Sequence, residues 1–261
     1  MIQVLDRALR ILNELQGGQR MSNADIARRL ELKPSTVHGI IRTLLAHGMV
    51  QQDRDSAHYR LGPATLLLGN VYLDTLELRS RVLAHTQELA RATGHAVRTG
   101  VLLHGDVVVV AHEPRPDGTR QISETGIVIP AHACALGKAL LAFNAEGSAE
   151  ALDYGRELPS MTGATITDHA ELRTRLESVR AEGVAYEDEE AIFGECGVAA
   201  PLLEPARAST RGRAARPHAA GAIGLVVPST QWPLDQEAIN RLRATARAIS
   251  RQLGAPAAHP R

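Results

Sequence analysis

The sequence predicts an α+β chain in two parts, a small helical head that ends in a β-hairpin and a larger body of strands and helices. Three observations predict this division. Apolar residues recur at helical spacing in three segments before residue 48, two short extended segments follow, and from residue 96 the apolar period is mainly that of strands. The 261 residues suffice for a sizeable core, and length alone suggests one or two domains.

The first two predicted helices are short. An apolar stripe marks the first, and Gly17–Gly18 ends it. Ser22 lies three residues before Asp25, a variant capping box that begins the second helix. The residues expected to face inward are Val4, Ala8, Ile11, Leu12 and Leu15 in the first helix and Ile26, Ala27 and Leu30 in the second.

The third helix, KPSTVHGIIRTLLAHG, has an apolar face and an unusually small outer face. Pro34 suits the first helical position, but Ser35 is the better N-cap by residue type, so the start stays open. Val37, Ile40, Ile41, Leu44 and Leu45 form the apolar face. The segments MVQQ and HYRLG then predict a hairpin, which completes a winged helix-turn-helix over residues 1–62.

A small outer face suits a helix that enters a DNA major groove about 12 Å wide. Gly39 and Ala46 leave room, and Arg42 can contact a guanine or a phosphate. The alternative is an ordinary amphipathic core helix. Residues 1–62 hold nine basic and six acidic side chains, and this excess of positive charge weakly favours the DNA-binding interpretation. The predicted contacts to double-stranded operator DNA are Ser22, Lys33, Ser35, Thr36, His38, Gly39, Arg42, Thr43 and Arg54.

Residues 63–93 are strongly helical, with a bend expected at Gly69 and a break at Leu78–Arg81. Apolar side chains lie on more than one side of this segment. We therefore expect residues 63–79 to form a linker helix that supports dimerisation. Residues 80–254 form the second predicted domain, and residues 255–261 a disordered tail.

Most of the second domain is predicted from its periodicity. Two strands flank the turn His104–Gly105–Asp106, and Gly183 ends a helix. The other expected elements are strands near 120–123 and 126–129, helices at 136–143, 168–182 and 234–253, and the strand segments GVAAPLL and GAIGLVV. The stretch 204–221 carries Arg207, Arg211, Arg213 and Arg216, which favours a disordered loop over a second nucleic-acid contact.

We looked for catalytic and metal-binding patterns and predict neither. Gly137–Lys138 lacks the rest of a phosphate-binding loop, and no nucleophile elbow occurs. The acidic run 187–190 is either a cation site or, as we favour, a solvated turn. His132, Cys134 and Cys196 have weak metal-ligand spacing, so ordinary buried thiols and a packed histidine are the preferred interpretation. No cofactor is expected.

The N-terminus lacks the pattern of a signal peptide, and no apolar run approaches the roughly 18–20 residues of a membrane span. The two cysteines do not form a disulfide framework. We expect a cytoplasmic protein.

Several segments, in order, resemble the IclR family of transcriptional regulators: LDRALRILNEL, SNADIARRLELKPSTVHGIIRTLLAHGMV, YRLGPATLLLG, PAHACALGKALLAF, TITDHAEL and the pair GVAAPLL/GAIGLVV. The likeness covers residues 2–253. The stretch GNVYLDTLELRSR is similar to glycerol operon regulators of actinobacteria within that family. The resemblance implies a GAF-like effector domain and a homodimer or dimer of dimers on a pseudo-palindromic operator. It favours a repressor released by its effector; an activator of the same family, an enzyme built on the second domain and a constitutive architectural DNA binder are the alternatives.

The resemblance also implies an effector pocket in the second domain. Its walls would be Cys134, Ala135, Leu136, Glu187, Asp188, Glu195, Cys196, Gly197, Gly224 and Val226. Family members often have Cys where Gly197 stands and Ser where Gly224 and Val226 stand, so an organic-acid ligand does not transfer directly. The closer similarity suggests glycerol 3-phosphate or glycerol, and a phosphate needs cations, for which Arg98, His132 and then Arg120 are the candidates.

Overall fold

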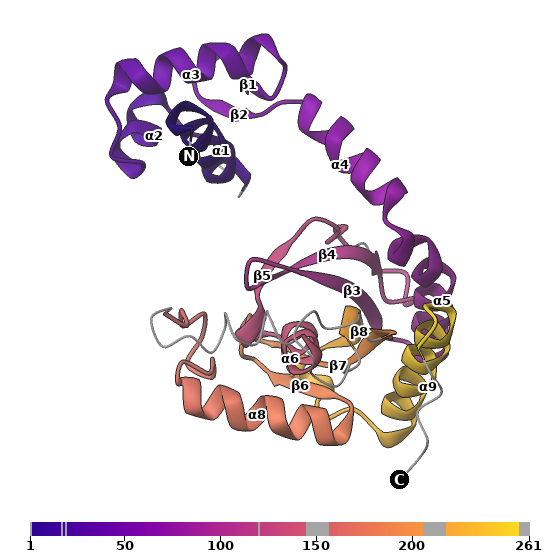
Figure 1. The fold of residues 1–261 in the computed structure, drawn as a ribbon. Coiled ribbons are helices and arrows are strands. Elements are labelled where there is room, and N and C mark those ends of the chain that lie inside the picture. The colour runs from indigo at the N-terminus through magenta and orange to yellow at the C-terminus, as the bar shows by residue number, and fades with distance from the viewer. Residues whose placement is uncertain are drawn as a thin grey trace. The chain divides into compact units, whose positions relative to one another are not determined.

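The computed structural model describes residues 2–16, 18, 20–119, 121–144, 157–205 and 218–255. The chain divides into two compact units, Met1–Leu76 and Glu77–Arg261 (Figure 1). The linker expected over residues 63–79 therefore contributes residues to both units.

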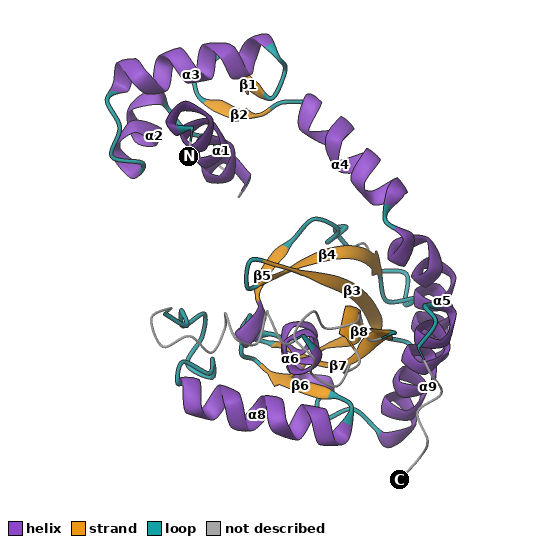
Figure 2. Ribbon diagram, viewed as in Figure 1, coloured by secondary structure: helices purple, strands orange, loops and turns teal. Residues whose placement is uncertain are grey.

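The first unit is a winged helix-turn-helix, as the spacing predicts. It contains α1 (Gln3–Gln16), α2 (Asn23–Arg29) and α3 (Pro34–Ala46), followed by the antiparallel strands β1 (Val50–Gln52) and β2 (Tyr59–Leu61). Figure 2 shows this hairpin beside the three helices. Ile11, Ile26 and Val37 are fully buried in the shared core. Val4, expected in the buried stripe, is 64% exposed, which corrects that prediction.

Local signals set the starts of α2 and α3. The backbone amide of Asp25 donates to Ser22 Oγ at 3.1 Å, and Ser22 N donates to Asp25 Oδ2 at 3.4 Å, which confirms the capping box. Pro34 occupies the first position of α3 and Lys33 is its N-cap, without a side-chain cap. Ser35 therefore lies inside the first turn.

The helix α4 (Ala64–Thr75) passes through Gly69 without interruption and ends at Leu76, whose backbone is extended. The expected break at Leu78–Arg81 is therefore wrong. The break lies at Leu76, and α5 (Glu77–Thr93) begins directly after it. Leu78 lies in the first turn of α5 and is buried in the second unit. No residue of α4 is buried.

The second unit is built on an antiparallel six-stranded sheet of order β5–β4–β3–β8–β7–β6. The strands are β3 (Ala96–Leu103), β4 (Asp106–Glu113), β5 (Val128–Pro130), β6 (Ala185–Asp188), β7 (Glu195–Glu204) and β8 (His218–Pro228). The helix α6 (Ala135–Phe143) packs on one face with α8 (His169–Glu182) against it. The helices α5 and α9 (Gln236–Gln252) lie side by side (Figure 1). Both also pack against the sheet, α5 mainly on β3 and β4 and α9 mainly on β7.

The hairpin of β3 and β4 contains a β-bulge. Across the hairpin of β3 and β4, Thr99 pairs with Ala111 while Gly100 pairs with Val109. Val110 is the extra residue, and its carbonyl accepts a hydrogen bond from Arg79 Nε of α5 at 3.1 Å. Arg98 is consequently the direct partner of His112.

Three predictions for the second unit need correction. Residues 121–123 form no strand, and β5 begins at Val128 because Gly126, with φ of 91°, lies in a turn. Strand β6 was not predicted. Glu187 and Glu190 are only 6% and 8% exposed, so the acidic run is not a solvated turn.

Arg120, residues 206–217 of the arginine-rich stretch and residues 256–261 of the expected tail lie outside the described residues. In the described part of the chain, none of the helices combines the length and the apolar character needed to cross a bilayer.

Candidate functional site

The outer face of α3 is a candidate nucleic-acid interface. Its inner residues Val37, Ile40 and Ile41 are buried in the head. The exposed predicted contacts on the other side are Ser35, His38, Gly39, Arg42 and Thr43, with Thr36 half-buried and Lys33 exposed just before the helix.

Gly39 has open space around it. A Cβ placed on this residue would have no neighbour within 4 Å. The fold of the head therefore does not require glycine here, although Gly costs about 1 kcal/mol relative to Ala inside a helix. Glycine at this position clears the outer face for something that approaches it.

The basic side chains of the head fall into two sets. Arg20 and Arg60 both pair with Asp53, at 2.5 and 3.3 Å. The side chains of Lys33, Arg42 and Arg54 have no hydrogen-bond or ion-pair partner within the described residues. The cations predicted to contact DNA are thus available for phosphates or bases.

Two hydroxyls on the predicted list already have partners. Ser22 Oγ donates to Asp25 Oδ2 at 2.7 Å, and Thr43 Oγ1 donates to the Gly39 carbonyl at 3.3 Å. Ser22 can still accept a bond, but its first task is to cap α2.

In the second unit, most of the predicted effector residues share the sheet face under α6. Direct strand partners lie on one face, and Arg98 pairs with Gly224, while Gly197 pairs with both Val226 and Glu187. A Cβ on Gly224 would lie 3.3 Å from Leu136, and one on Gly197 would lie 3.9 Å from Ala135. Glu195 is two residues before Gly197 and so shares its face.

Four other predicted residues lie elsewhere. Cys196 alternates with Gly197 and donates through Sγ to Asp188 Oδ1 at 3.2 Å, so both point away from the α6 face. Cys134 caps α6, with Sγ accepting from Gly137 N at 3.3 Å. His132 is 3.0 Å from the Pro159 carbonyl and lines a cavity of about 380 Å³.

The three residues considered for a metal therefore have separate partners. Burial raises the pKa of Cys134 to about 12, which opposes the thiolate that a metal would need. Within the described residues no group of three His, Cys, Asp or Glu side chains is arranged to hold a metal ion.

Arg98 is the centre of a buried charged cluster. Its side chain is 8% exposed and donates two bonds to Glu195, at 2.6 and 2.9 Å, and two to Glu124, one of them 2.9 Å long. Burial alone would lower the pKa of Arg98, but both carboxylates outweigh it and raise that pKa. Burial likewise opposes ionisation of Glu124, yet Arg98 lowers the pKa of that carboxyl. Arg98 is therefore a buried residue of its strand.

His112 completes this cluster and is uncharged. Its Nδ1 accepts a bond from Glu124 N at 3.2 Å, so we assign the ring proton to Nε2, which lies 3.5 Å from Glu124 Oε2. Burial lowers the pKa of His112. One arginine with two carboxylates and a neutral histidine leaves a net charge of −1.

Glu187 occupies the N-terminal end of α6. Its Oε2 accepts from Ala135 N at 3.1 Å and its Oε1 from Ala191 N at 3.2 Å, and burial raises its pKa to about 7. Nearby in sequence, Glu190 binds the fully buried Lys138 at 2.5 Å. Glu187, Glu190 and Lys138 thus all have bonding partners within the second unit.

Sequence reasoning missed His112 and Glu124 in the Arg98 cluster, and the pair of Lys138 and Glu190. A hairpin without the bulge at Val110 would pair Arg98 with Ala111, so the pattern gave no signal for His112. Glu124 and Glu190 lie in irregular segments far from their partners.

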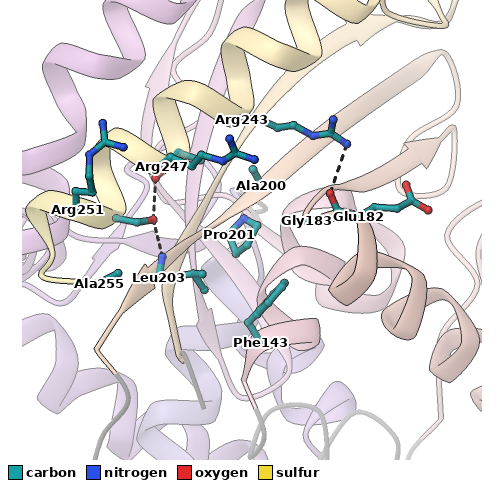
Figure 3. Close-up of a pocket in the computed structure, with 12 residues that line it drawn as sticks. Phe143, Glu182, Gly183, Ala200, Pro201, Leu203, Arg243, Arg247, Arg251 and Ala255 are labelled. Carbon is teal, nitrogen blue, oxygen red and sulfur yellow. Dashed lines mark hydrogen bonds between the residues drawn. The ribbon is translucent and has the colours of Figure 1, made fainter. Parts of the chain in front are cut away.

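A second cavity, of about 360 Å³, is lined by one face of α9 and the end of β7 (Figure 3). Arg243, Arg247 and Arg251 recur at four-residue spacing along it, over an apolar floor that includes Pro201 and Leu203. Arg243 donates to the Glu182 carbonyl at 3.4 Å. The four-residue spacing of these arginines is the feature of the sequence that indicates this face of α9.

These two units define a class of protein: transcriptional regulators with a winged helix-turn-helix head and a separate α+β domain that binds a small molecule. Residues 4–54 match the IclR helix-turn-helix domain, and residues 70–251 match the C-terminal domain of the bacterial transcriptional regulator IclR. The chain belongs to the IclR family. Members of this family are transcriptional regulators and not enzymes. This confirms the prediction that the chain carries no catalytic site.

Two similar proteins are glycerol operon regulatory proteins. The one from Streptomyces griseus is 39% identical and the one from Streptomyces coelicolor 40%, each over 97% of both chains. Among solved structures, an IclR-type regulator from Alicyclobacillus acidocaldarius has a TM-score of 0.77 at 24% identity, over 97% of this chain and all of that one. An IclR homologue from Microbacterium hydrocarbonoxydans, complexed with 4-hydroxybenzoate, has a TM-score of 0.73 at 23% identity, with the same coverage. Both structures support the fold.

Proposed function

We propose that the protein represses an operon for glycerol catabolism and releases its operator when a small effector binds the second unit. The observation that carries this proposal is the outer face of α3, which is small, exposed and has unpaired cations within the described chain. The similarity to two glycerol operon regulatory proteins supports the choice of operon.

In this proposal α3 lies in the major groove. Arg42 can bind a guanine through two hydrogen bonds or a phosphate through its charge, while Ser35, Thr36 and His38 contact bases or backbone. Lys33 and Arg54, before the helix and in the turn of the wing, contact phosphates on either side. Gly39 and Ala46 allow the close approach.

A second copy of the chain would cover the apolar residues that the head exposes. On α4 these are Leu66, Leu67, Leu68, Val71 and Tyr72, each 50–67% exposed. Leu5 and Leu9 of α1 are 56% and 53% exposed. An exposed apolar surface of this extent favours an interface, and a two-fold dimer matches a pseudo-palindromic operator. A dimer or a dimer of dimers is therefore part of the proposal.

The effector site is proposed on the sheet face under α6, where Arg98, Glu195, Gly197 and Gly224 come together. The complex of an IclR homologue with 4-hydroxybenzoate supports ligand binding in this fold. Effector binding would be coupled to operator affinity by a free energy of typically about 1–3 kcal/mol.

The test begins with the operator. Genomic fragments selected by the full-length protein are footprinted, and a labelled duplex of the protected sequence is titrated with wild type and Arg42→Ala. If Arg42 contacts a base, Arg42→Ala should weaken the free energy of operator binding by about 1–3 kcal/mol. Arg241→Ala, an exposed arginine paired with Glu237 on α9, is the control. Absence of any protected sequence, or equal affinity of Arg42→Ala and wild type, would contradict the proposed interface.

A further inference from the structure

The charges under α6 restrict the chemical class of the effector. From their arrangement we infer that this face takes an uncharged small polyol, such as glycerol, and excludes its phosphate ester and simple carboxylates. The inference rests on the proposed function for the location of the effector. It concerns charge selection, which neither the family nor the relatives' names supply.

The first observation is that Arg98 has almost no donor left. A guanidinium carries five N–H groups, and four of them already bind Glu124 and Glu195. A phosphate could bind Arg98 only by displacing at least one carboxylate. The displaced carboxylate would then lose its partner beside a second negative group, which is unfavourable in a buried site.

The second observation is that two backbone amides at the N-terminal end of α6 are already bonded. Helix N-termini bind anions through their free N–H groups. Here Ala135 N donates to Glu187 and Gly137 N donates to Cys134 Sγ. Lys138, the remaining cation of α6, is fully buried and bound to Glu190. These two amides and the Lys138 side chain are therefore not available to an anionic ligand.

The third observation concerns what remains available. A carboxylate has about four acceptor positions; Arg98 uses two on each of Glu124 and Glu195, and His112 Nε2 lies 3.5 Å from Glu124 Oε2. The side chains of both glutamates are 24% exposed, so their remaining acceptors can be reached from solvent. Hydroxyl groups donate to carboxylates through strong charge-assisted bonds. A compound with several adjacent hydroxyls and no negative charge therefore fits this surface.

The ligand class is tested by calorimetric titration of the full-length protein with glycerol and with glycerol 3-phosphate at equal ionic strength. Calorimetry is preferred to thermal shift because polyols stabilise proteins non-specifically. Both titrations are repeated in Arg247→Gln/Arg251→Gln, which removes two cations from the cavity of Figure 3 as an alternative phosphate site. We expect glycerol to bind and glycerol 3-phosphate to bind at least tenfold more weakly in that variant.

The charge argument is tested by Glu124→Gln/Glu195→Gln, which keeps the shape of both side chains. Loss of charged acceptors should weaken glycerol binding about tenfold or more, while the freed Arg98 should increase affinity for glycerol 3-phosphate. Glu177→Gln, on the exposed side of α8, is the matched control and should change neither affinity. Circular dichroism verifies that the double variant is folded.

The outcomes separate this inference from the proposed function. Glycerol 3-phosphate binding as tightly as glycerol in Arg247→Gln/Arg251→Gln overturns the inference, and so does the absence of glycerol binding. Release of the operator by glycerol 3-phosphate alone would leave the proposed function standing without the inference. Glycerol binding by a protein with no specific operator would support the inferred ligand class and contradict the proposed function.

Discussion

Replacing Gly39 with alanine should stabilise the protein and weaken its binding to DNA. The added Cβ has no neighbour within 4 Å, so it causes no clash inside the head. Alanine is favoured over glycine in a helix interior by about 1 kcal/mol. For a domain the size of the Met1–Leu76 unit this raises the melting temperature by roughly 4–8 °C.

The same methyl group would occupy space needed by the groove. Overpacking a close contact costs about 1–3 kcal/mol, or roughly 5- to 150-fold in the dissociation constant. Fluorescence anisotropy with the footprinted duplex measures this loss at fixed salt. Because no charge changes, the slope of log affinity against log salt should stay the same, whereas Arg42→Ala should reduce it by about one if Arg42 binds a phosphate.

Gly69→Ala is the matched control, since Gly69 also lies inside a helix, α4, with no neighbour within 4 Å of an added Cβ. It should give a similar gain in stability, and its operator affinity is compared only where light scattering shows the wild-type mass, because α4 belongs to the proposed dimer interface. If Gly39→Ala binds the operator as tightly as wild type, Gly39 is not retained for DNA approach, and the interpretation of the α3 face is refuted.

Other predictions concern the buried charges and the exposed face of α4. Burial raises the pKa of Glu187 to about 7, so the unfolded chain releases this proton at a lower pH than the folded protein does. The free energy of unfolding should therefore fall by about 3 kcal/mol as pH rises from about 4.5 to 7. Glu187→Gln should remove this pH dependence in denaturant titrations between pH 4.5 and 8. A wild-type slope unchanged by the substitution would contradict the assignment. Lys138→Met leaves Glu190 unpaired and should lower the free energy of unfolding by about 3–5 kcal/mol. The double variant Lys138→Met/Glu190→Gln should recover most of this loss. A double variant as unstable as Lys138→Met would argue against the ion pair. Leu67→Glu should shift light-scattering mass towards the monomer, and an unchanged mass would exclude α4 from the interface.

The head could be predicted from the sequence because its determinants are local. Helical spacing located Ile11, Ile26 and Val37, and the pair Ser22 and Asp25 marked the start of α2. Such signals act within a few residues and therefore survive in a single sequence.

The site under α6 was predicted only in part because its contacts are distant in sequence. Arg98 meets Glu124 after 26 residues and Glu195 after 97. Strand alternation cannot tell a buried arginine from an exposed one, and it cannot show that its charge is already balanced. The choice of Arg98 as a phosphate-binding cation assumed a free side chain, whereas in the structure Arg98 already binds two carboxylates.

The bulge at Val110 connects α5 to the hairpin that holds the charged cluster. Val110 is the extra residue, so deleting it would restore regular pairing with Ala111 still opposite Thr99 and His112 still opposite Arg98. The deletion would also take away the carbonyl that Arg79 binds. A single residue outside the cluster thus links α5 to this hairpin, and its deletion would remove that contact without changing any strand pairing of the cluster.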